Sequence, residues 1–271
     1  MRLHVREGVA RRLESASESD FKRIGSSFLS TSQYAYEISD ADMIKEFSAT
    51  SLVLKLLYKD LVLAGLPTAS KPLHLLWWLY YTKHYPKKKM WERLSRRSYK
   101  TTKKWMHIIR KAIMVVVPDM DKKKGKYPFD ECWYGHKFKK AGLRYGIATC
   151  IQTGEIVLVQ GPFPAGAWPD QKIYTQHVVP KLSPGEKVEA DRGYRHPTIR
   201  RPENFDCRSE KKAKGAVAGR HETINGRLKN FASLDERYRH DIKEHKYYFY
   251  TACVMYNLMH RQYGPTFDVY Y

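Results

Sequence analysis

The sequence predicts an α/β protein in which a basic, all-helical region precedes a domain of mixed strands and helices. Three observations support this prediction. Apolar residues recur at helical spacing between residues 48 and 113. Between residues 145 and 160 they alternate with small or polar residues, as they do in strands. Farther along, a helix, a short strand and a second helix follow one another, separated by Gly and Pro.

The chain carries a large excess of positive charge, which indicates a polyanionic partner. It has 271 residues, with 49 Lys and Arg against 28 Asp and Glu, a formal net charge of +21. Residues 83–126 alone hold 16 Lys and Arg and three acids. This clustering favours DNA over a membrane surface, and no apolar run is long enough to span a bilayer. The widely spaced cysteines predict reduced, intracellular thiols.

Residues 1–68 are expected to form a polar N-terminal segment that contains one helix. Residues 1 to about 45 show little periodicity, which is typical of a partly disordered stretch. From Ser48 to Ala64, apolar residues at helical spacing predict an amphipathic helix, with Leu52, Leu56 and Leu63 on its apolar face. Gly and Pro residues then end it.

Residues 69–114 are expected to form three helices arranged as a helix-turn-helix module. The stretch Leu73–Tyr81 is apolar nearly all round, which predicts a buried helix that Pro86 ends. A short second helix is expected over Lys87–Leu94, and Ser98 is the expected N-cap of the third.

The third helix is expected to have an apolar face and a basic face. The apolar face comprises Trp105, Ile108, Ile109, Ala112 and Ile113. The candidate contacts to DNA phosphates are Lys100, Lys103, Lys104, Arg110 and Lys111. A solvated helix face over a helical core is the alternative. Beyond Ala112, the run IMVVV either ends this helix or forms a short buried strand, since periodicity alone does not decide.

Residues 115–271 are expected to form the mixed domain. A β-hairpin is predicted over residues 145–160, with its turn at Thr153 and Gly154. A helix is expected to begin at Asp170 and to stop at Pro180.

The second half of this domain is expected to begin with a short strand that ends at Asp191. An irregular basic segment, residues 192–214, follows it. The next helix is expected to bury Ile224, Leu228 and Phe231. Its Gly226 suggests the close approach of another backbone or a ligand. A last helix, from residue 244 to about residue 262, has the composition of a core element.

Two carboxylates are candidates for catalysis. Asp191 lies at the carboxyl end of a strand, where α/β proteins place their sites, and the arginines around it suit a hard cation bound beside phosphate. Glu222 lies on the helix that follows. Further candidate DNA contacts are Arg192, Arg195, Arg220 and Lys229. Asp191 has an alternative role as a turn cap before Gly193, and Glu222 as an acid that the helix dipole favours.

Four stretches together resemble the DDE transposases of the PIF/Harbinger-like superfamily. They are HLLWWLYYTKHYP, the block from WYGHKF to AWPD, EADRGYR and RHETINGRLKNF. The resemblance runs roughly from residue 66 to residue 260. It implies a ribonuclease-H-like domain, a mixed sheet flanked by helices. It also implies a site for two Mg²⁺ or Mn²⁺ ions that hydrolyses DNA at transposon ends and joins the freed 3′-hydroxyl to target DNA.

The resemblance also assigns roles to single residues. Asp191 matches the second catalytic aspartate of the family, and Glu222 matches the catalytic glutamate. Asp170 matches a family aspartate at the start of a helix and is a further candidate metal ligand. The first catalytic aspartate normally lies in an Asp-Gly-Thr motif, which this sequence lacks. Asp119, directly after MVVVP, is the candidate for that position, and the alternative is a loop left by a lost strand.

Three functional readings follow from these observations. The first is an active DDE nuclease or transposase that uses Asp119, Asp191 and Glu222. The second is a DNA-binding protein, derived from a transposase, whose catalytic site is impaired. A structural or RNA-binding protein of similar fold is the third reading. The expected partner is DNA, with a homo-oligomer left open and no membrane. A nuclear location fits the lysine cluster at residues 87–89, which equally suits contact with DNA.

Overall fold

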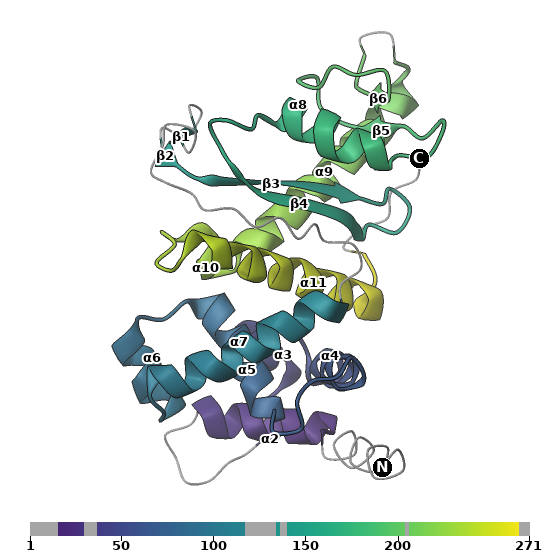
Figure 1. Ribbon diagram of the computed structural model, residues 1–271. Coiled ribbons are helices and arrows are strands. Elements are labelled where there is room, and N and C mark those ends of the chain that lie inside the picture. Colours follow the sequence, from purple (N-terminus) through teal and green to yellow (C-terminus); the bar gives the residue numbers. More distant parts are fainter. Residues whose placement is uncertain (1–15, 30–36, 117–133, 136–139, 204–205, 266–271) are drawn as a thin grey trace. The chain divides into compact units, whose positions relative to one another are not determined.

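The structure is a computed structural model that describes residues 16–29, 37–116, 134–135, 140–203 and 206–265. The described residues form a mixed α/β chain that is rich in helices and has only small sheets (Figure 1). They divide between two compact units, a helical unit and a mixed unit. The helical unit draws on residues 1–118, 228–240 and 247–264, and the mixed unit on residues 119–227, 241–246 and 265–271. Within the described ranges, no helix has the length and apolar character to cross a membrane.

The helical unit begins with two helices that the sequence did not predict. They are α2 (Glu18–Leu29) and α3 (Asp40–Phe47), and both lie in the stretch expected to be partly disordered. Phe21 and Phe28 of α2 are buried, as is Phe47 of α3. A few large aromatic side chains anchor these two helices in a core, although their sequences show little periodicity. The rest of the stretch, residues 1–15 and 30–36, lies outside the described residues.

The remaining helices of this unit follow the predicted order more closely. They are α4 (Ser51–Leu63), α5 (Pro72–His84), α6 (Lys88–Ser95), α7 (Tyr99–Val116), α10 (Ala232–Asp235) and most of α11 (His245–Tyr263). The three expected helices between residues 69 and 114 are confirmed as α5, α6 and α7. The run after Ala112 continues α7 as far as Val116, so the helical alternative holds there.

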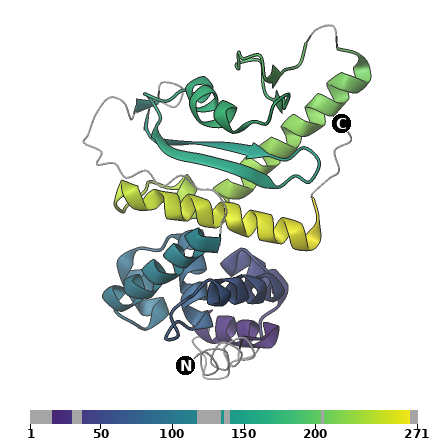
Figure 2. The same cartoon turned by 45° about the vertical axis from the view of Figure 1, so that its right-hand side comes forward.

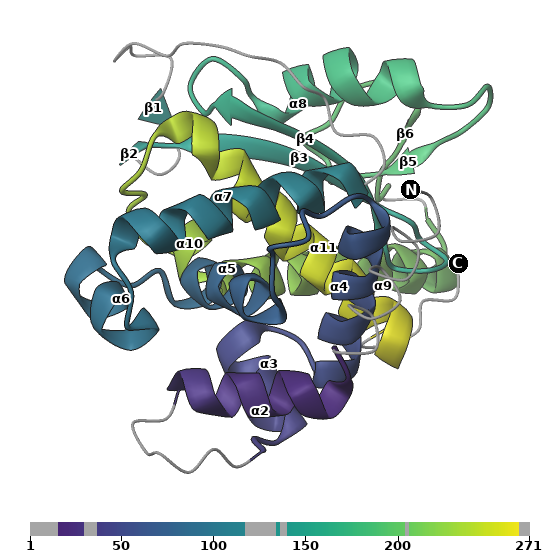
Figure 3. The same cartoon turned by 60° about the horizontal axis from the view of Figure 1, so that its bottom comes forward.

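The helix α5 lies at the centre of this unit. Its residues from His74 to Thr82 are all buried, and it contacts α2, α3, α7 and α10. Figure 3 shows α5 among the surrounding helices. The indole N–H of Trp78 donates to Thr251 Oγ1 of α11 at 2.9 Å, so the one polar group of this buried ring has a hydrogen-bond partner. The predicted buried helix over Leu73–Tyr81 is confirmed.

The buried faces of two helices differ from the predicted ones. In α4, Leu56 and Leu63 are 38% and 61% exposed, although both were placed on the apolar face. The residues that α4 buries are Ser51, Val53, Leu54, Leu57, Tyr58, Leu61 and Val62. In α7, the buried residues are Thr102, Met106, Ile109, Arg110 and Ile113. Each of these helices has apolar residues on more than one side, so the neighbouring helices decide which side is covered.

The mixed unit is built on a β-hairpin of β3 (Leu143–Thr149) and β4 (Ile156–Pro164), which pair antiparallel. Gly154 forms the turn with a φ of 77°, and its N–H donates to the carbonyl of Cys150 at 2.8 Å. Both the hairpin and its turn were predicted. Figure 2 shows the two strands side by side.

The other strands of the mixed unit are short. β5 (Val188–Glu189) pairs parallel with β6 (Ile199–Arg200), and β1 (Tyr134–Gly135) pairs with β2 (Lys140–Ala141). The strands that the structure describes therefore form three separate two-stranded sheets. The predicted α/β class is confirmed, whereas the expected single mixed sheet is not formed by the described residues.

Two helical segments complete the mixed unit. α8 (Asp170–Ile173) continues through a π-helical turn, Tyr174–Val178, and a 3₁₀ turn, Val179–Lys181, so the predicted helix is present as one irregular run. α9 (Arg208–Lys229) begins earlier than expected, within the segment predicted to be irregular. Gly226 of α9 faces open space, because a Cβ built there meets no atom within 4 Å. The expected close approach at Gly226 is therefore not observed.

The two faces of α4 predict opposite results for two neighbouring leucines. Leu57 is 2% exposed and Leu56 is 38% exposed. We expect Leu57→Ala to lower the free energy of unfolding by about 2–5 kcal/mol, because it leaves a cavity in the core. Leu56→Ala, the matched control, should change it by no more than about 0.5 kcal/mol. Denaturant unfolding of both variants measures the difference, and equal losses would contradict the assigned face.

Candidate functional site

The candidate site lies in the mixed unit, where the start of α8 meets the loop that follows β5. Asp170 is the first residue of α8, and Pro169 before it has the extended conformation of an N-cap. Asp191 comes two residues after β5 and begins a turn through Gly193. Both aspartates are exposed. The two acids that the resemblance selects in this region therefore lie at element ends, as expected.

Hydrogen bonds attach α8 to the loop that begins at Asp191. The side chain of Gln171 accepts from the N–H of Arg195 at 2.8 Å and donates to the carbonyl of the same residue at 3.0 Å. One turn later, the hydroxyl of Tyr174 lies 2.6 Å from that of Thr198. These contacts hold the loop along the side of α8, so Asp170 and Asp191 belong to one local structure.

The strand β3 of the hairpin contacts Asp170 and the start of α8. Arg144 of β3 lies 3.5 Å from the Asp170 carboxylate and donates to the carbonyl of Trp168 at 3.0 Å. Two residues along the strand, a Cβ on Gly146 would come within 2.8 Å of the Cγ2 atom of Ile173. Because position 146 has no side chain, α8 lies directly on the strand, and its first carboxylate comes within reach of Arg144.

Tyr194 lies in the loop after Asp191, where the charges of both Asp170 and Asp191 act on its hydroxyl. Its ring meets the ring of Tyr174 edge-on, with 5.7 Å between centroids. Burial of the ring, with the charges of Asp170 and Asp191 nearby, raises the pKa of the Tyr194 hydroxyl to about 12. The hydroxyl therefore stays protonated at neutral pH and can donate a hydrogen bond to an acceptor in this region.

Asp191 also has the turn-cap role that the sequence left open. Its Oδ1 atom accepts from the N–H of Gly193 at 3.0 Å. This bond fixes the direction of the carboxylate. The capping role and a role as a metal ligand are compatible, since a carboxylate offers two oxygens.

Glu222 lies on α9, on the side opposite the buried Ile224, and it is exposed. The predicted core residues Ile224, Leu228 and Phe231 are all buried, which confirms the orientation of this helix segment. In Figure 1, α9 passes behind the hairpin. Arg220, a candidate DNA contact, is 6% exposed and donates to the carbonyl of Ile151 at 2.8 Å. Arg220 therefore ties α9 to the hairpin turn, and its prediction as a surface contact to phosphate is corrected.

The structure does not bring three metal-ligating residues together within the ranges it describes. No group of three His, Cys, Asp or Glu side chains there could hold an ion. Asp170, Asp191 and Glu222 therefore do not form such a group by themselves. Asp119, the candidate for the first catalytic position, lies outside the described residues. The metal site stays a prediction that depends on a ligand beyond these ranges.

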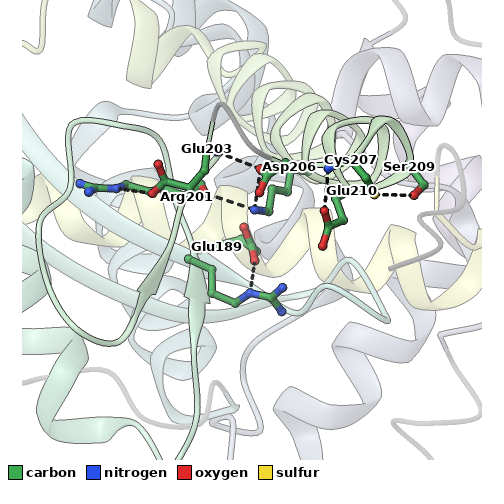
Figure 4. A network of polar contacts seen from close by, with 9 residues as sticks. Glu189, Arg201, Glu203, Asp206, Cys207, Ser209 and Glu210 are labelled. Carbon is green, nitrogen blue, oxygen red and sulfur yellow. Dashed lines mark hydrogen bonds and ion pairs between the residues drawn. The ribbon is translucent and has the colours of Figure 1, made fainter.

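A polar network lies where the segment after β6 meets the start of α9 (Figure 4). Lys214 Nζ lies 2.8 Å from Asp206 Oδ2 and donates to the carbonyl of Arg201 at 3.2 Å. The side chains of Lys214 and Asp206 are 9% and 7% exposed. The hydrogen bond from Lys214 lowers the pKa of Asp206, so this acid remains charged and paired at neutral pH.

Two further acids around the start of α9 are paired with groups of the protein itself. Glu189 lies 3.3 Å from Arg200, and Glu210 accepts from the N–H of Cys207, the residue before α9, at 2.8 Å. A surface pocket of about 340 Å³ opens here. Its lining residues are Arg200, Glu210, Ala213 and Lys214. Because Glu189 and Asp206 pair with its two cations, this pocket is not the candidate site.

The basic face of α7 is largely as predicted. Lys100, Lys103, Lys104 and Lys111 are exposed. Arg110 is 5% exposed, and its guanidinium lies 4.7 Å from the centroid of the Tyr247 ring and 2.7 Å from His107 Nδ1. The prediction that Arg110 contacts DNA is corrected, because its stacking on Tyr247 keeps it in the core. The other predicted contacts, Arg192, Arg195 and Lys229, are exposed.

Two residues of the candidate site were not found by sequence reasoning. Arg144 is the one charged residue of β3, which is a weak indication of a special role. Tyr194 belongs to the ADRGY stretch, but the influence of both Asp170 and Asp191 on its hydroxyl becomes visible only in the structure. In comparisons with known proteins, no family model matches this chain, and no curated protein or solved structure matches it significantly.

The contact between Gly146 and α8 yields a testable prediction. We expect Gly146→Ala to lower the free energy of unfolding by about 1–3 kcal/mol, since the new methyl group must displace Ile173. Gly142→Ala is the matched control, because a Cβ at position 142 meets nothing within 4 Å. Thermal unfolding of the two variants measures the difference. If Gly146→Ala is as stable as Gly142→Ala, the close contact does not position α8.

Proposed function

We propose that this chain is a DDE-type transposase, or an endonuclease derived from one, that binds DNA and cleaves and joins phosphodiester bonds. The observation that carries the proposal is the attachment of α8, with Asp170, to the loop that begins at Asp191. These are two of the acids at which the chain resembles the PIF/Harbinger-like transposases. The proposal includes a ribonuclease-H-like arrangement of the mixed unit.

The residues proposed to hold metal offer chemistry that suits Mg²⁺ or Mn²⁺. Asp191 and Glu222 are exposed carboxylates, Asp170 is a further oxygen ligand, and Asp119 would supply the remaining one. Two bound ions would stabilise the attacking and leaving oxygens of a phosphodiester. The protein's own part is to orient these carboxylates: Gly193 directs Asp191, and Arg144 directs Asp170. Exposed Arg192 and Arg195 would bind the phosphates beside them.

The basic face of α7 supports the DNA-binding part of this proposal. Its exposed lysines lie on a helix whose opposite side is fixed in a core, so they form a stable array of positive charge. The exposed residues Lys87, Lys88 and Lys89 suit nuclear import of a protein that acts on chromosomal DNA. A fluorescent fusion that is excluded from the nucleus would contradict the nuclear location.

A second candidate function is a DNA-binding protein, derived from a transposase, that does not cleave DNA. It is favoured by the lack of any group of three metal-ligating residues within the described ranges. The missing Asp-Gly-Thr motif points the same way. The two candidates share the basic face of α7 and differ in whether Asp119 completes the set of carboxylates.

Cleavage of plasmid DNA tests the first candidate. We expect nicking that requires added Mg²⁺ or Mn²⁺ and disappears with a chelator. Asp191→Asn and Glu222→Gln should each lower the rate by about a hundredfold or more, since each removes a charged ligand. Glu186→Gln, a change at an exposed acid of the same unit, is the control. Nicking that persists in both site variants would sink the assignment, and wild-type activity in Asp119→Asn would remove Asp119 from it.

Binding of DNA at several salt concentrations tests the basic face of α7. We expect Lys103→Ala combined with Lys104→Ala to weaken binding. The slope of log K against log salt should fall by up to about 1.8, because two fewer phosphates are neutralised. Lys45→Ala combined with Lys59→Ala removes two exposed lysines from other helices of the same unit and should leave the slope unchanged. An unchanged slope in the α7 variant would identify its lysines as an ordinary solvated face.

A further inference from the structure

One acidic residue lies within the basic α6–α7 region. Residues 87–116 contain eleven Lys and Arg and a single acid, Glu92 of α6. An acid among so many cations lowers the positive potential that attracts DNA. Its charge alone therefore works against the proposed binding, and its contacts give it a different role.

The carboxylate of Glu92 binds the start of α7. Its Oε1 atom accepts from the N–H of Tyr99, the first residue of that helix, at 2.8 Å. The first N–H groups of a helix have no partner within the helix, and a negative charge near them is favoured by the helix dipole. Ser98 supplies the adjacent cap, because its hydroxyl accepts from the N–H of Thr101 at 3.3 Å. Glu92 and Ser98 together fix where α7 begins.

A second contact joins the same two helices. Trp91, the neighbour of Glu92, is fully buried, and its indole N–H donates to Thr102 Oγ1 of α7 at 2.8 Å. The turn between the helices runs through Arg96, which has a left-handed φ of 53°. A residue other than glycine rarely adopts a left-handed backbone conformation unless surrounding contacts hold it there. The hydrogen bonds of Trp91 to Thr102 and of Glu92 to Tyr99 provide such contacts, because each joins α6 to α7 across the turn.

We propose that Glu92 is a positioning residue for DNA binding, which holds the α6–α7 corner so that the exposed lysines of α7 and Arg93, Arg96 and Arg97 reach one DNA backbone together. The inference rests on the DNA-binding function proposed above. The partner is the phosphate backbone of duplex DNA. Glu92 already occupies the anion-binding start of α7, so the phosphates contact the side chains of the corner instead.

The charge of Glu92 and its contact with α7 predict opposite changes in DNA affinity when Glu92 is removed, which makes the inference testable. If Glu92 acts only through its charge, removing it from a basic surface tightens the binding of DNA. If it acts by position, removing it weakens binding although the net charge rises. Glu92→Gln separates the two effects, because the amide oxygen still accepts from Tyr99 N–H while the negative charge is gone.

The experiment measures binding of the full chain to a short random-sequence DNA duplex, well below the melting temperature of every variant. We expect Glu92→Ala to bind at least about fivefold more weakly, as for the loss of a helix cap, and to show a smaller salt slope. Glu92→Gln should bind as tightly as the wild type or more tightly. Asp60→Ala removes an exposed acid from α4 of the same unit and controls for the change in net charge.

Each outcome decides for or against the inference. Weaker binding by Glu92→Ala together with retained binding by Glu92→Gln supports it. Tighter binding by both variants would show a purely electrostatic effect and overturn it. Equal weakening of both would also overturn it, because the amide should preserve the position of α7. A wild-type chain that does not bind DNA would instead refute the proposed function, which distinguishes that failure from a failure of this inference.

Discussion

The burial of α5 on all of its sides is the constraint on which the helical unit depends. A helix that is apolar all round cannot face water, so other helices must enclose it. α2, α3, α7 and α10 all contact it, and they include two helices whose own sequences predict little. The enclosure also determines the surface. α7 turns Met106, Ile109 and Ile113 inward, and its lysines consequently lie on the outside. The basic face is therefore a result of how the core is packed.

Sequence reasoning succeeded where the pattern was local. The buried α5, the hairpin with its turn at Gly154 and the helix that starts at Asp170 all follow from short-range periodicity and from Gly and Pro. It failed where distant residues decide. Arg110 resembles a surface cation in sequence, and it is buried because Tyr247, far along the chain, stacks on its guanidinium. The exposed Leu56 and the buried Leu57 are indistinguishable by hydrophobicity, and only the position of neighbouring helices separates them.

The candidate site shows the same division. The positions of Asp170 and Asp191 at element ends were predictable, and so was the turn at Gly193. The contacts that place them in one local structure were not, because they join Gln171 to a loop in a later part of the chain. Arg144 reaches Asp170 from an earlier strand, across a separation that no local pattern spans. The proposed set of carboxylates also includes Glu222 and Asp119, and no pattern in the sequence defines the surroundings of Asp119.

The pairing of Arg144 with Asp170 makes the surroundings of the two aspartates different. Asp170 already has a counter-ion supplied by the protein itself, whereas Asp191 is bound by an uncharged amide N–H. If the proposed site holds a divalent ion, the ion would compete with the guanidinium of Arg144 for Asp170, whereas at Asp191 it would meet only an uncharged N–H group. In the proposed metal site the two aspartates would therefore be unequal ligands, because Asp170 would have to exchange Arg144 for the metal ion and Asp191 would not.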